Sequence, residues 1–585
     1  MLLMYDKRYK KFLKFHSDLI FIGILSLLYG FIFLKRVVYP DLSFDTINYH
    51  FFLGKSGFFN FPYFFKSSEF YPLGMHSLNP IVDMMGYASY SILGYRLGTI
   101  LSALSIIGTS VLGIFILRDI LRNYLERKEL FIVYLVLIAP VFIINEALFQ
   151  VATYCTDNIY AFLLMLYLFL FLKFINLKKE KNYIQYVLVL GFLGGLIITK
   201  LTNFIYIAPF LLVTVYFVYK KVFCGSEKSY KKFLATIFIF GIPLFIVNYF
   251  LVINFLKSGN PFFPYYNGIF KSIYYPLKSW AFNFGPVTLN QRIFYPFYAI
   301  RDPAFLGEIK EMFPDVKILV IFFYVIISYL FLISKKIKFN RDEKVFLLIY
   351  FFTFFLWQIQ FGYSRYGIFL EILGGMVSIL LAFKIFISEK FIHPIKIFTV
   401  LFIFFMIFQS IKIVIFNYQY DVSWRPTTSY REWSDSFFSK KIFKKYTTIN
   451  GKTSKDLEDV DVILQCVNPS TLYFSTIKKL ENLPMLDIDR VLSRDLNNNK
   501  EYVSMRDQVI STSLNKKSLN FAIVFSDSEA IMKGTSREVC LSAIKEENSG
   551  GEKIRITKEI NVDNFMADKN FKLKILLGSY TINNQ

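Results

Sequence analysis

Residues 17–50 read SDLIFIGILSLLYGFIFLKRVVYPDLSFDTINYH, and this stretch decides the fold. The run from 17 to 37 is long and apolar enough to cross the hydrocarbon core of a bilayer, so it predicts a membrane-spanning helix. The following segment, Tyr39 to His50, places Asp45 and His50 directly after that helix. A carboxylate so close to hydrocarbon is costly and usually faces a cavity, a partner or a substrate. Asp45 is therefore the first candidate for a functional site.

The composition of the chain as a whole is that of a membrane protein. Of 585 residues, 55% are hydrophobic and only 19% are charged, and the mean hydropathy is +0.44. The net charge of +23 would suit a nucleic-acid partner, but Lys and Arg stand in short clusters between apolar runs. That distribution is typical of membrane topology. We therefore predict a membrane protein with no nucleic-acid partner.

Apolar segments of spanning length recur from about residue 17 to about residue 417. They predict an α-helical polytopic membrane protein with about 11 transmembrane helices. The expected spans are 17–37, 96–117, 129–144, 158–173, 183–199, 202–219, 234–256, 317–334, 345–359, 366–386 and 395–417.

Basic residues in the connections predict the orientation. The N-terminus is basic from Lys7 to Lys14, and every second connection after it is basic again, whereas the loop 145–157 has no Lys or Arg. Because basic loops stay in the cytoplasm, we expect a cytoplasmic N-terminus and a C-terminal region outside the cytoplasmic (inner) membrane. Lys35 and Arg36, at the outer end of the first helix, run against this trend. The first segment is expected to stay as an anchor, since no small-residue cleavage site follows it.

Two domains are expected, with their boundary near residue 417. The first, 1–417, is the transmembrane domain, with large outer loops at 39–95 and 257–316. The second, 418–585, changes abruptly to a charged composition and predicts a small α/β domain on the outer face. Within it we expect strands at 460–467, 519–525, 553–560 and 571–577 and an amphipathic helix at 536–547.

The four cysteines do not form a disulfide framework. Cys155 and Cys224 are expected on opposite sides of the membrane and cannot pair, whereas Cys466 and Cys540 share the tail and form a candidate pair. No Cys-x-x-Cys, His-Glu-x-x-His, P-loop or dinucleotide fingerprint occurs in the sequence. Any chemistry must therefore come from scattered acids and bases.

Six short motifs follow one another along residues 1–420. They are Asp45-Thr-Ile-Asn-Tyr-His50, Tyr71-Pro-Leu-Gly, Thr156-Asp157, Gly194-Gly-Leu-Ile-Ile-Thr-Lys200, Ser258-Gly-Asn-Pro-Phe-Phe-Pro264 and Arg365-Tyr366. In this order, and on one predicted face of the membrane, they resemble the GT-C superfamily of polytopic glycosyltransferases. The likeness is to its bacterial branch, which is related to protein O-mannosyltransferases and aminoarabinose transferases. The resemblance implies transfer of a sugar from a polyprenyl-phosphate carrier to a glycan, lipid or protein acceptor outside the cytoplasmic membrane.

The resemblance also assigns catalytic residues. Family members carry an essential acid in the first outer loop, which makes Asp45 the expected base, and a second acid at the position of Asp157. The chemistry agrees, because a hydroxyl that attacks an anomeric carbon needs a carboxylate to take its proton. Both residues have a simpler alternative, since Asp often caps the start of a helix.

Substrate-binding residues follow from the charge of the donor. The departing lipid phosphate needs fixed positive charge, and Lys200 and Arg365 are the candidates on the outer face. Each could instead be an anchor at the membrane interface. The other candidate substrate-binding residues are His50, Glu69, Tyr71 and Tyr366. For His50 the alternative is a place on an interfacial helix face, and for Glu69 it is a solvated loop.

A divalent metal is a further option for the first outer loop. Asp45, His50, Glu69 and His76 offer oxygen and imidazole ligands suited to zinc or manganese. Their spacings match no tight ligand motif, and some GT-C members use a divalent ion whereas others do not. No cofactor is assigned from the sequence, and a divalent metal stays open.

Two other functions also stay open. A flippase or transporter of lipid-linked glycans could line a passage with the same charges, and an O-antigen ligase or polymerase also uses a lipid-linked sugar. A transporter typically has polar residues at mid-membrane and an internal repeat. The sequence shows neither, and Asp45, Asp157 and Lys200 are all expected at one end of the helices. This favours chemistry at a membrane surface.

Overall fold

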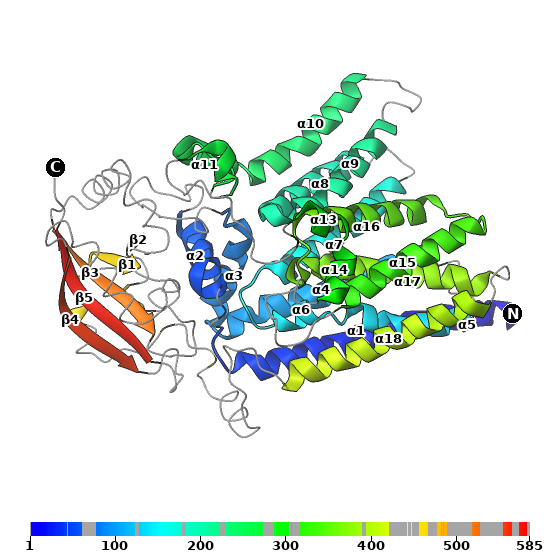
Figure 1. Ribbon diagram of the computed structural model, residues 1–585, viewed down its shortest axis with the longest axis horizontal. Helices are drawn as coiled ribbons and strands as arrows, with labels where there is room; N and C mark the ends of the chain where they lie inside the picture. The colour runs from blue at the N-terminus through cyan, green and yellow to red at the C-terminus, as the bar shows by residue number, and fades with distance from the viewer. Residues whose placement is uncertain are drawn as a thin grey trace.

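The computed structural model consists of a body of helices up to Gln419 and a small β-sheet after it (Figure 1). The structure describes residues 2–41, 43, 45–60, 78–122, 124, 128–177, 183–220, 230–263, 265–272, 286, 288–302, 306, 316–388, 393–419, 442, 446, 455–465, 477–480, 483, 485–487, 518–526, 554–563 and 572–581.

Long apolar helices make up the helical body (Figure 1). In chain order the helices and helical turns are α1 (Leu2–Val37), η1 (Thr46–His50), α2 (Phe51–Asn60), α3 (Ile81–Leu93), η3 (Leu97–Thr99), α4 (Ile100–Leu121), α5 (Lys128–Phe142), α6 (Asn145–Phe149), α7 (Asp157–Ile175), α8 (Tyr183–Ile198), η5 (Leu201–Asn203), α9 (Phe204–Val218), α10 (Tyr230–Val247), α11 (Phe250–Ser258), α12 (Asn267–Phe270), α13 (Leu289–Ile293), α14 (Tyr295–Arg301), α15 (Lys317–Ser334), α16 (Arg341–Gln360), η8 (Ser364–Gly367), α17 (Ile368–Ile387) and α18 (His393–Gln419). Within the described ranges, 8 helical stretches are long and apolar enough to cross a membrane, and α5 and α8 contribute shorter apolar helices. The chain is a multi-pass α-helical membrane protein, as predicted, while the number of crossings stays a prediction.

Helix α17 lies at the centre of the helical body. The spanning window that ends at Ile387 is 100% buried, the highest share among the candidate spans. Two glycines let neighbouring helices approach it: a Cβ on Gly374 would lie 2.7 Å from the ring of Tyr350 on α16, and one on Gly375 would lie 2.9 Å from Val141 on α5. Small residues permit such close helix packing in membranes. Because α17 is packed on several sides, the residues at its N-terminal end are held firmly in place.

One predicted span, 234–256, is broken in two. Helices α10 and α11 are separated by Asn248 and Tyr249. The side-chain amide of Asn248 donates hydrogen bonds to the carbonyl oxygens of Gly195 at 3.0 Å and of Leu244 at 2.9 Å. These bonds stabilise the break and tie it to α8. The expectation of one continuous helix is therefore wrong at this position.

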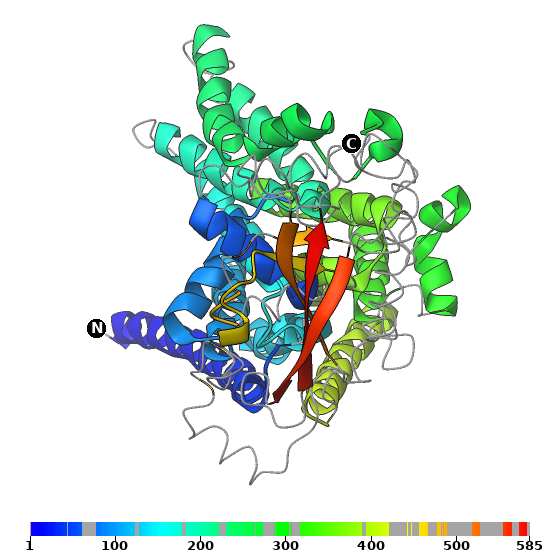
Figure 2. The same ribbon diagram turned by 90° about the vertical axis from the view of Figure 1, so that its left-hand side faces the viewer.

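The described part of the C-terminal region forms a five-stranded sheet at one end of the molecule, and α2 and α3 lie between this sheet and the long helices (Figures 1 and 2). Its strands are β1 (Val462–Gln465), β2 (Met485–Asp487), β3 (Ser518–Ser526), β4 (Ile554–Asp563) and β5 (Lys572–Thr581). The order is β2-β1-β3-β5-β4, with β1 parallel to both of its neighbours and β5 antiparallel to both of its own.

Most of this sheet agrees with the sequence prediction. Strands β1, β3, β4 and β5 overlap the predicted strands, whereas β2, with 3 residues, is too short to leave a pattern in the sequence. The predicted helix 536–547 lies outside the described residues, as do Cys224, Cys466 and Cys540.

Candidate functional site

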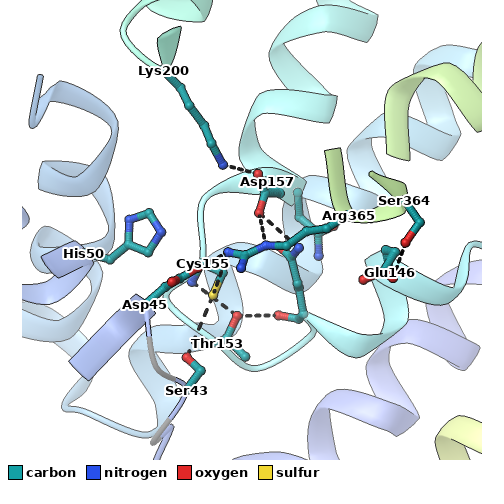
Figure 3. A network of polar contacts seen from close by, with 12 residues as sticks. Ser43, Asp45, His50, Glu146, Thr153, Cys155, Asp157, Lys200, Ser364 and Arg365 are labelled. Carbon is teal, nitrogen blue, oxygen red and sulfur yellow. Dashed lines mark hydrogen bonds and ion pairs between the residues drawn. The ribbon is translucent and has the colours of Figure 1, made fainter. Parts of the chain in front are cut away.

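Four charged side chains from distant parts of the sequence meet at the end of the helical body where η1 lies (Figure 3). Asp45 precedes η1, Asp157 begins α7, Lys200 follows α8, and Arg365 lies in η8 just before α17. The Arg365 guanidinium bonds to both carboxylates, through Nη2 to Asp45 Oδ2 and through Nε to Asp157 Oδ2, the latter at 3.0 Å. Lys200 Nζ bonds to the other oxygen of Asp157, Oδ1. We call these four residues the charge cluster.

The charge cluster is largely buried. The exposed fractions of the side chains are 14% for Asp45, 7% for Asp157, 18% for Lys200 and 15% for Arg365. Two cations face two anions, so their formal charges cancel. A buried charge is expensive when isolated and is tolerated when it is paired and hydrogen-bonded. Each charge of the cluster is therefore tolerated in its buried position only because its partners neutralise it.

The protonation state of Asp45 follows from its neighbours. Burial alone would raise the pKa of the Asp45 carboxyl, but the charges of Arg365 and Lys200 and the hydrogen bond from Arg365 lower this pKa below its ordinary value. Asp45 is thus a carboxylate throughout the neutral pH range. Burial raises the pKa of the neighbouring Cys155 thiol to about 12, so that side chain stays a neutral thiol.

Neither acid of the charge cluster caps a helix. Asp45 precedes η1, but its side chain makes no capping hydrogen bond and its backbone is already helical, with φ −68° and ψ −39°. Asp157 is the first residue of α7, where Thr156 occupies the cap position without a side-chain bond. The capping alternative therefore does not account for these two side chains, which point into the ion pairs instead.

A buried acid that the sequence analysis did not single out, Asp41, ties the first outer loop to the loop before α7. Asp41 Oδ2 accepts hydrogen bonds from the backbone N–H of Tyr154 at 2.8 Å and from the hydroxyl of Thr46 at 2.7 Å, while Oδ1 accepts one from the backbone N–H of Ser43 at 3.0 Å. The side chain is 0% exposed. Because the acids of the charge cluster lie on these two loops, Asp41 fixes their spacing. Its only sequence signal is that it is the first acid after the first span.

Arg36 is one of the two basic residues that run against the topology trend, and its contacts explain its position. It is only 2% exposed, although it lies at the end of a spanning helix. Its Nη1 donates to the carbonyl oxygens of Leu148 and Phe149, and its Nη2 donates to the side-chain oxygen of Asn417 at 3.0 Å. Arg36 therefore joins α1, α6 and α18, and its position is structural.

Aromatic rings flank Lys200 in the charge cluster. Its Nζ lies 5.2 Å from the ring centroid of Tyr366 and 5.8 Å from that of Tyr160, within the range of cation–π attraction. Tyr366, a predicted substrate-binding residue, therefore contacts the charge cluster through Lys200. The carbonyl oxygen of Tyr366 also accepts a hydrogen bond from the hydroxyl of Tyr206. Rings and a carboxylate together hold the ammonium group in position.

His50 lies near Asp45 and pairs with Asp83 on α3. The distance from His50 Nδ1 to Asp83 Oδ1 is 2.6 Å, and the two side chains are 5% and 8% exposed. The alternative that His50 sits on an interfacial helix face is therefore wrong, because the side chain is buried. The remaining predicted residues, Glu69 and Tyr71, lie outside the described residues, as does His76.

Three residue types that bind metals also lie close together at this end. Asp45, His50 and Cys155 offer ligand atoms that are all within 4.8 Å of one another, and this set has the chemistry that zinc accepts. Arg365 already bonds to Asp45, however, and its Nη2 lies 3.9 Å from Cys155 Sγ. A cation among these ligands would meet the guanidinium at close range, and the neutral thiol would have to lose its proton. The arrangement does not fit a resident metal while Arg365 occupies this position, and we assign none.

Comparisons with known proteins give structural similarity without a match in sequence. No family model matches the chain, and no curated protein matches it. The similar solved structures include an oligosaccharyltransferase from Archaeoglobus fulgidus in complex with Zn and sulfate, with 12% identity and a TM-score of 0.42 over 86% of this chain and 67% of that one. They also include ArnT from Cupriavidus metallidurans in the apo state, with 9% identity and a TM-score of 0.47 over 96% of this chain and 97% of that one.

At such identities and scores, the similarity by itself assigns no activity, donor or catalytic residue to this chain.

Proposed function

We propose that this chain is a GT-C-type membrane glycosyltransferase that transfers a sugar from a polyprenyl-phosphate donor to an acceptor on the outer side of the cytoplasmic membrane. The observation that carries the proposal is the charge cluster, in which two cations and two carboxylates are buried together at one end of the membrane helices. Departure of a lipid phosphate requires fixed positive charge, and attack by a hydroxyl requires a proton acceptor. The charge cluster offers both.

The two cations suit the leaving phosphate. A sugar linked to a lipid phosphate is a diester with one negative charge, and cleavage of the bond to the sugar leaves a more highly charged monoester. Charge that grows in the transition state is what preorganised cations stabilise best. Arg365 presents a planar guanidinium that matches phosphate oxygens. Lys200 carries three N–H donors, and Asp157 is the carboxylate that it contacts among the described residues.

Asp45 is the proposed base. In the free protein, Arg365 neutralises it and keeps it ionised. As Arg365 turns toward an incoming phosphate, Asp45 loses its counter-charge and becomes more basic, at the stage when the acceptor hydroxyl must lose its proton. Asp157 bonds to both cations and is proposed to keep them in place through this exchange.

The positions of two further buried ion pairs favour a transferase over a flippase. Lys317 and Glu371, whose charged atoms are 3.0 Å apart, lie in the first turns of α15 and α17. Glu343 and Lys384, 2.8 Å apart, lie in the first turn of α16 and the last turn of α17. A transporter is expected to carry such groups at mid-membrane, where its substrate binds. An O-antigen ligase or polymerase would use the charge cluster in the same way and would differ in its acceptor.

The test is release of undecaprenyl phosphate from a panel of undecaprenyl-phosphate-linked sugars by the protein in lipid nanodiscs, with a cell-envelope extract as the source of acceptor. We expect release by the wild type and a loss of about 100-fold or more in Asp45→Asn and in Arg365→Ala, the usual cost of removing one transition-state charge contact. Arg341→Ala is the control, because Arg341 is 51% exposed at the start of α16. Unchanged release in the two cluster variants, with both normally folded, would overturn the proposal.

A further inference from the structure

His50 and Asp83 form a buried pair that the proposed function leaves without a task. His50 is the last residue of η1, and Asp83 lies in the first turn of α3. His50 Nδ1 is 2.6 Å from Asp83 Oδ1. The second ring nitrogen, Nε2, is buried and has no hydrogen-bond partner among the residues that the structure describes. One ring nitrogen is therefore paired, and the other is left to interact with an O–H or N–H group of a ligand.

The carboxylate of Asp83 decides which nitrogen carries the proton. An ionised carboxylate only accepts hydrogen bonds, so the short contact places the ring proton on Nδ1. In the neutral imidazole, Nε2 then has a lone pair and acts as an acceptor. A buried acceptor that stays unpaired is unfavourable, and a hydroxyl donor from a bound molecule would satisfy it.

One ring nitrogen of His50 lies close to the charge cluster. A ring nitrogen of His50, a carboxylate oxygen of Asp45 and Cys155 Sγ all lie within 4.8 Å of one another. Figure 3 shows the His50 ring next to Asp45, on the side of the network from which Lys200 reaches Asp157. A hydroxyl bound between Asp45 and His50 would be within reach of both groups and next to the cations that hold the phosphate.

We infer that His50, oriented by Asp83, receives from Asp45 the proton that the acceptor hydroxyl loses during sugar transfer. This inference rests on the proposed function. A bond forms between the acceptor oxygen and the anomeric carbon, and the bond between that carbon and the phosphate oxygen breaks. Its electron pair leaves with the phosphate, which Arg365 and Lys200 hold. The proton passes from the hydroxyl to Asp45 and on to His50 Nε2, Asp83 stabilises the resulting imidazolium, and water later takes the proton.

Asp45 and His50 have different tasks in this scheme. The lowered pKa of Asp45 makes it a weak holder of a proton at neutral pH, although it can accept the hydrogen bond that aligns the hydroxyl. An imidazole binds a proton more tightly than a carboxylate does. Asp45 thus takes the proton from the hydroxyl as the base, and His50 holds it afterwards.

The scheme predicts a dependence on pH that Asp45 alone would not give. A His50 that carries protons on both ring nitrogens has no lone pair, so the transfer rate should fall when His50 is protonated. Several titratable and charged groups surround His50. They are Asp83 on α3, Asp45 and Tyr49 near it in the sequence, Cys155 before α7, and Arg365 and Lys200 farther away.

The experiment compares His50→Gln, His50→Ala and Asp83→Asn with the wild type in nanodiscs. The readouts are the rate of undecaprenyl phosphate release from pH 5 to pH 9 and the binding of undecaprenyl phosphate itself. We expect His50→Gln to lose about 100-fold in rate and to lose the acid limb of the profile, with binding of the carrier unchanged. Added imidazole should restore part of the rate in His50→Ala. Asp83→Asn should keep carrier binding, lose at least about 10-fold in rate and shift the acid limb. His393→Gln, at the exposed start of α18, is the matched control.

The outcomes separate this inference from the proposed function. If the wild type releases the carrier, Arg365→Ala does not, and His50→Gln keeps the wild-type rate and acid limb, the inference is wrong and the proposed function stands. If imidazole restores nothing to a folded His50→Ala that still binds the carrier, the residue is only structural and the inference is again wrong. If the wild type releases no carrier from any donor, both fail together.

Discussion

Arg365→Lys isolates what the geometry of the guanidinium contributes to the charge cluster. Arg365 reaches Asp45 through Nη2 and Asp157 through Nε, whereas a lysine has one ammonium group and cannot occupy both positions. A lysine ends one bond short of Nη2, the atom that reaches Asp45, and Lys200 still bonds to Asp157, so Asp45 is the carboxylate left without its partner. Asp45 is 14% exposed. We therefore expect a loss of about 3 kcal/mol in the free energy of unfolding at pH 7, the lower end of the cost of breaking a buried pair.

The pH dependence of this loss gives a second check. Arg365 lowers the pKa of Asp45, so in the wild type the ion pair stabilises the fold above the unfolded-state pKa of about 3.9, and this stability is lost as the pH falls through the lower folded-state pKa. Without Arg365 at that position, burial raises the pKa of Asp45 instead, and the ionised form opposes folding at neutral pH. The difference between the wild type and Arg365→Lys should therefore shrink toward pH 4.

The assay is thermal unfolding in nanodiscs, followed by tryptophan fluorescence. Trp357 is a suitable reporter, because it is fully buried and donates a hydrogen bond to the carbonyl oxygen of Tyr363, two residues before Arg365. The double variant Asp45→Asn/Arg365→Lys removes the unpaired charge and should recover part of the lost stability. Equal stability of Arg365→Lys and the wild type at pH 7, or a double variant no better than Arg365→Lys, would refute the reasoning.

Two further predictions concern the frame around the charge cluster. Asp41→Asn should lower the transfer rate about 10-fold or more while carrier binding persists, because the amide cannot accept all three hydrogen bonds that the carboxylate of Asp41 accepts. Unchanged kinetics would show that Asp41 does not set the spacing of the acids. Gly374→Ala should destabilise the helical body by about 1–3 kcal/mol, since its Cβ would meet Tyr350 at 2.7 Å, whereas Gly30→Ala, with nothing within 4 Å, should be neutral or slightly stabilising in the same melting assay.

The sequence predicted the helices well, because their signal is local. An apolar run of spanning length needs no partner to be recognised, and the strands β3, β4 and β5 likewise carry their own pattern. The break at Asn248 could not be foreseen, since it depends on a carbonyl of α8 that lies 53 positions away.

In the candidate site, too, local features could be predicted from the sequence, whereas pairings between distant residues could not. The sequence suggested Asp45, Asp157, Lys200 and Arg365 one by one from charge and motif, but not which cation would bond to which acid. It gave no reason to join His50 to Asp83 or to expect that Asp41 would be fully buried. Such pairings depend on how loops between helices fold back on one another, and that is a property of tertiary packing.

The sequence distance inside the charge cluster has a consequence for how the protein is made. Asp45 and Arg365 are 320 positions apart. A chain that enters the membrane from its N-terminus exposes Asp45 early, and the cation that neutralises it arrives only when η8 and α17 have been synthesised. Until then the acid has to stay hydrated, so the first outer loop cannot settle into its final place. Closure of the site is therefore one of the last steps of assembly, and the ion pair forms only in a chain whose late helices have packed.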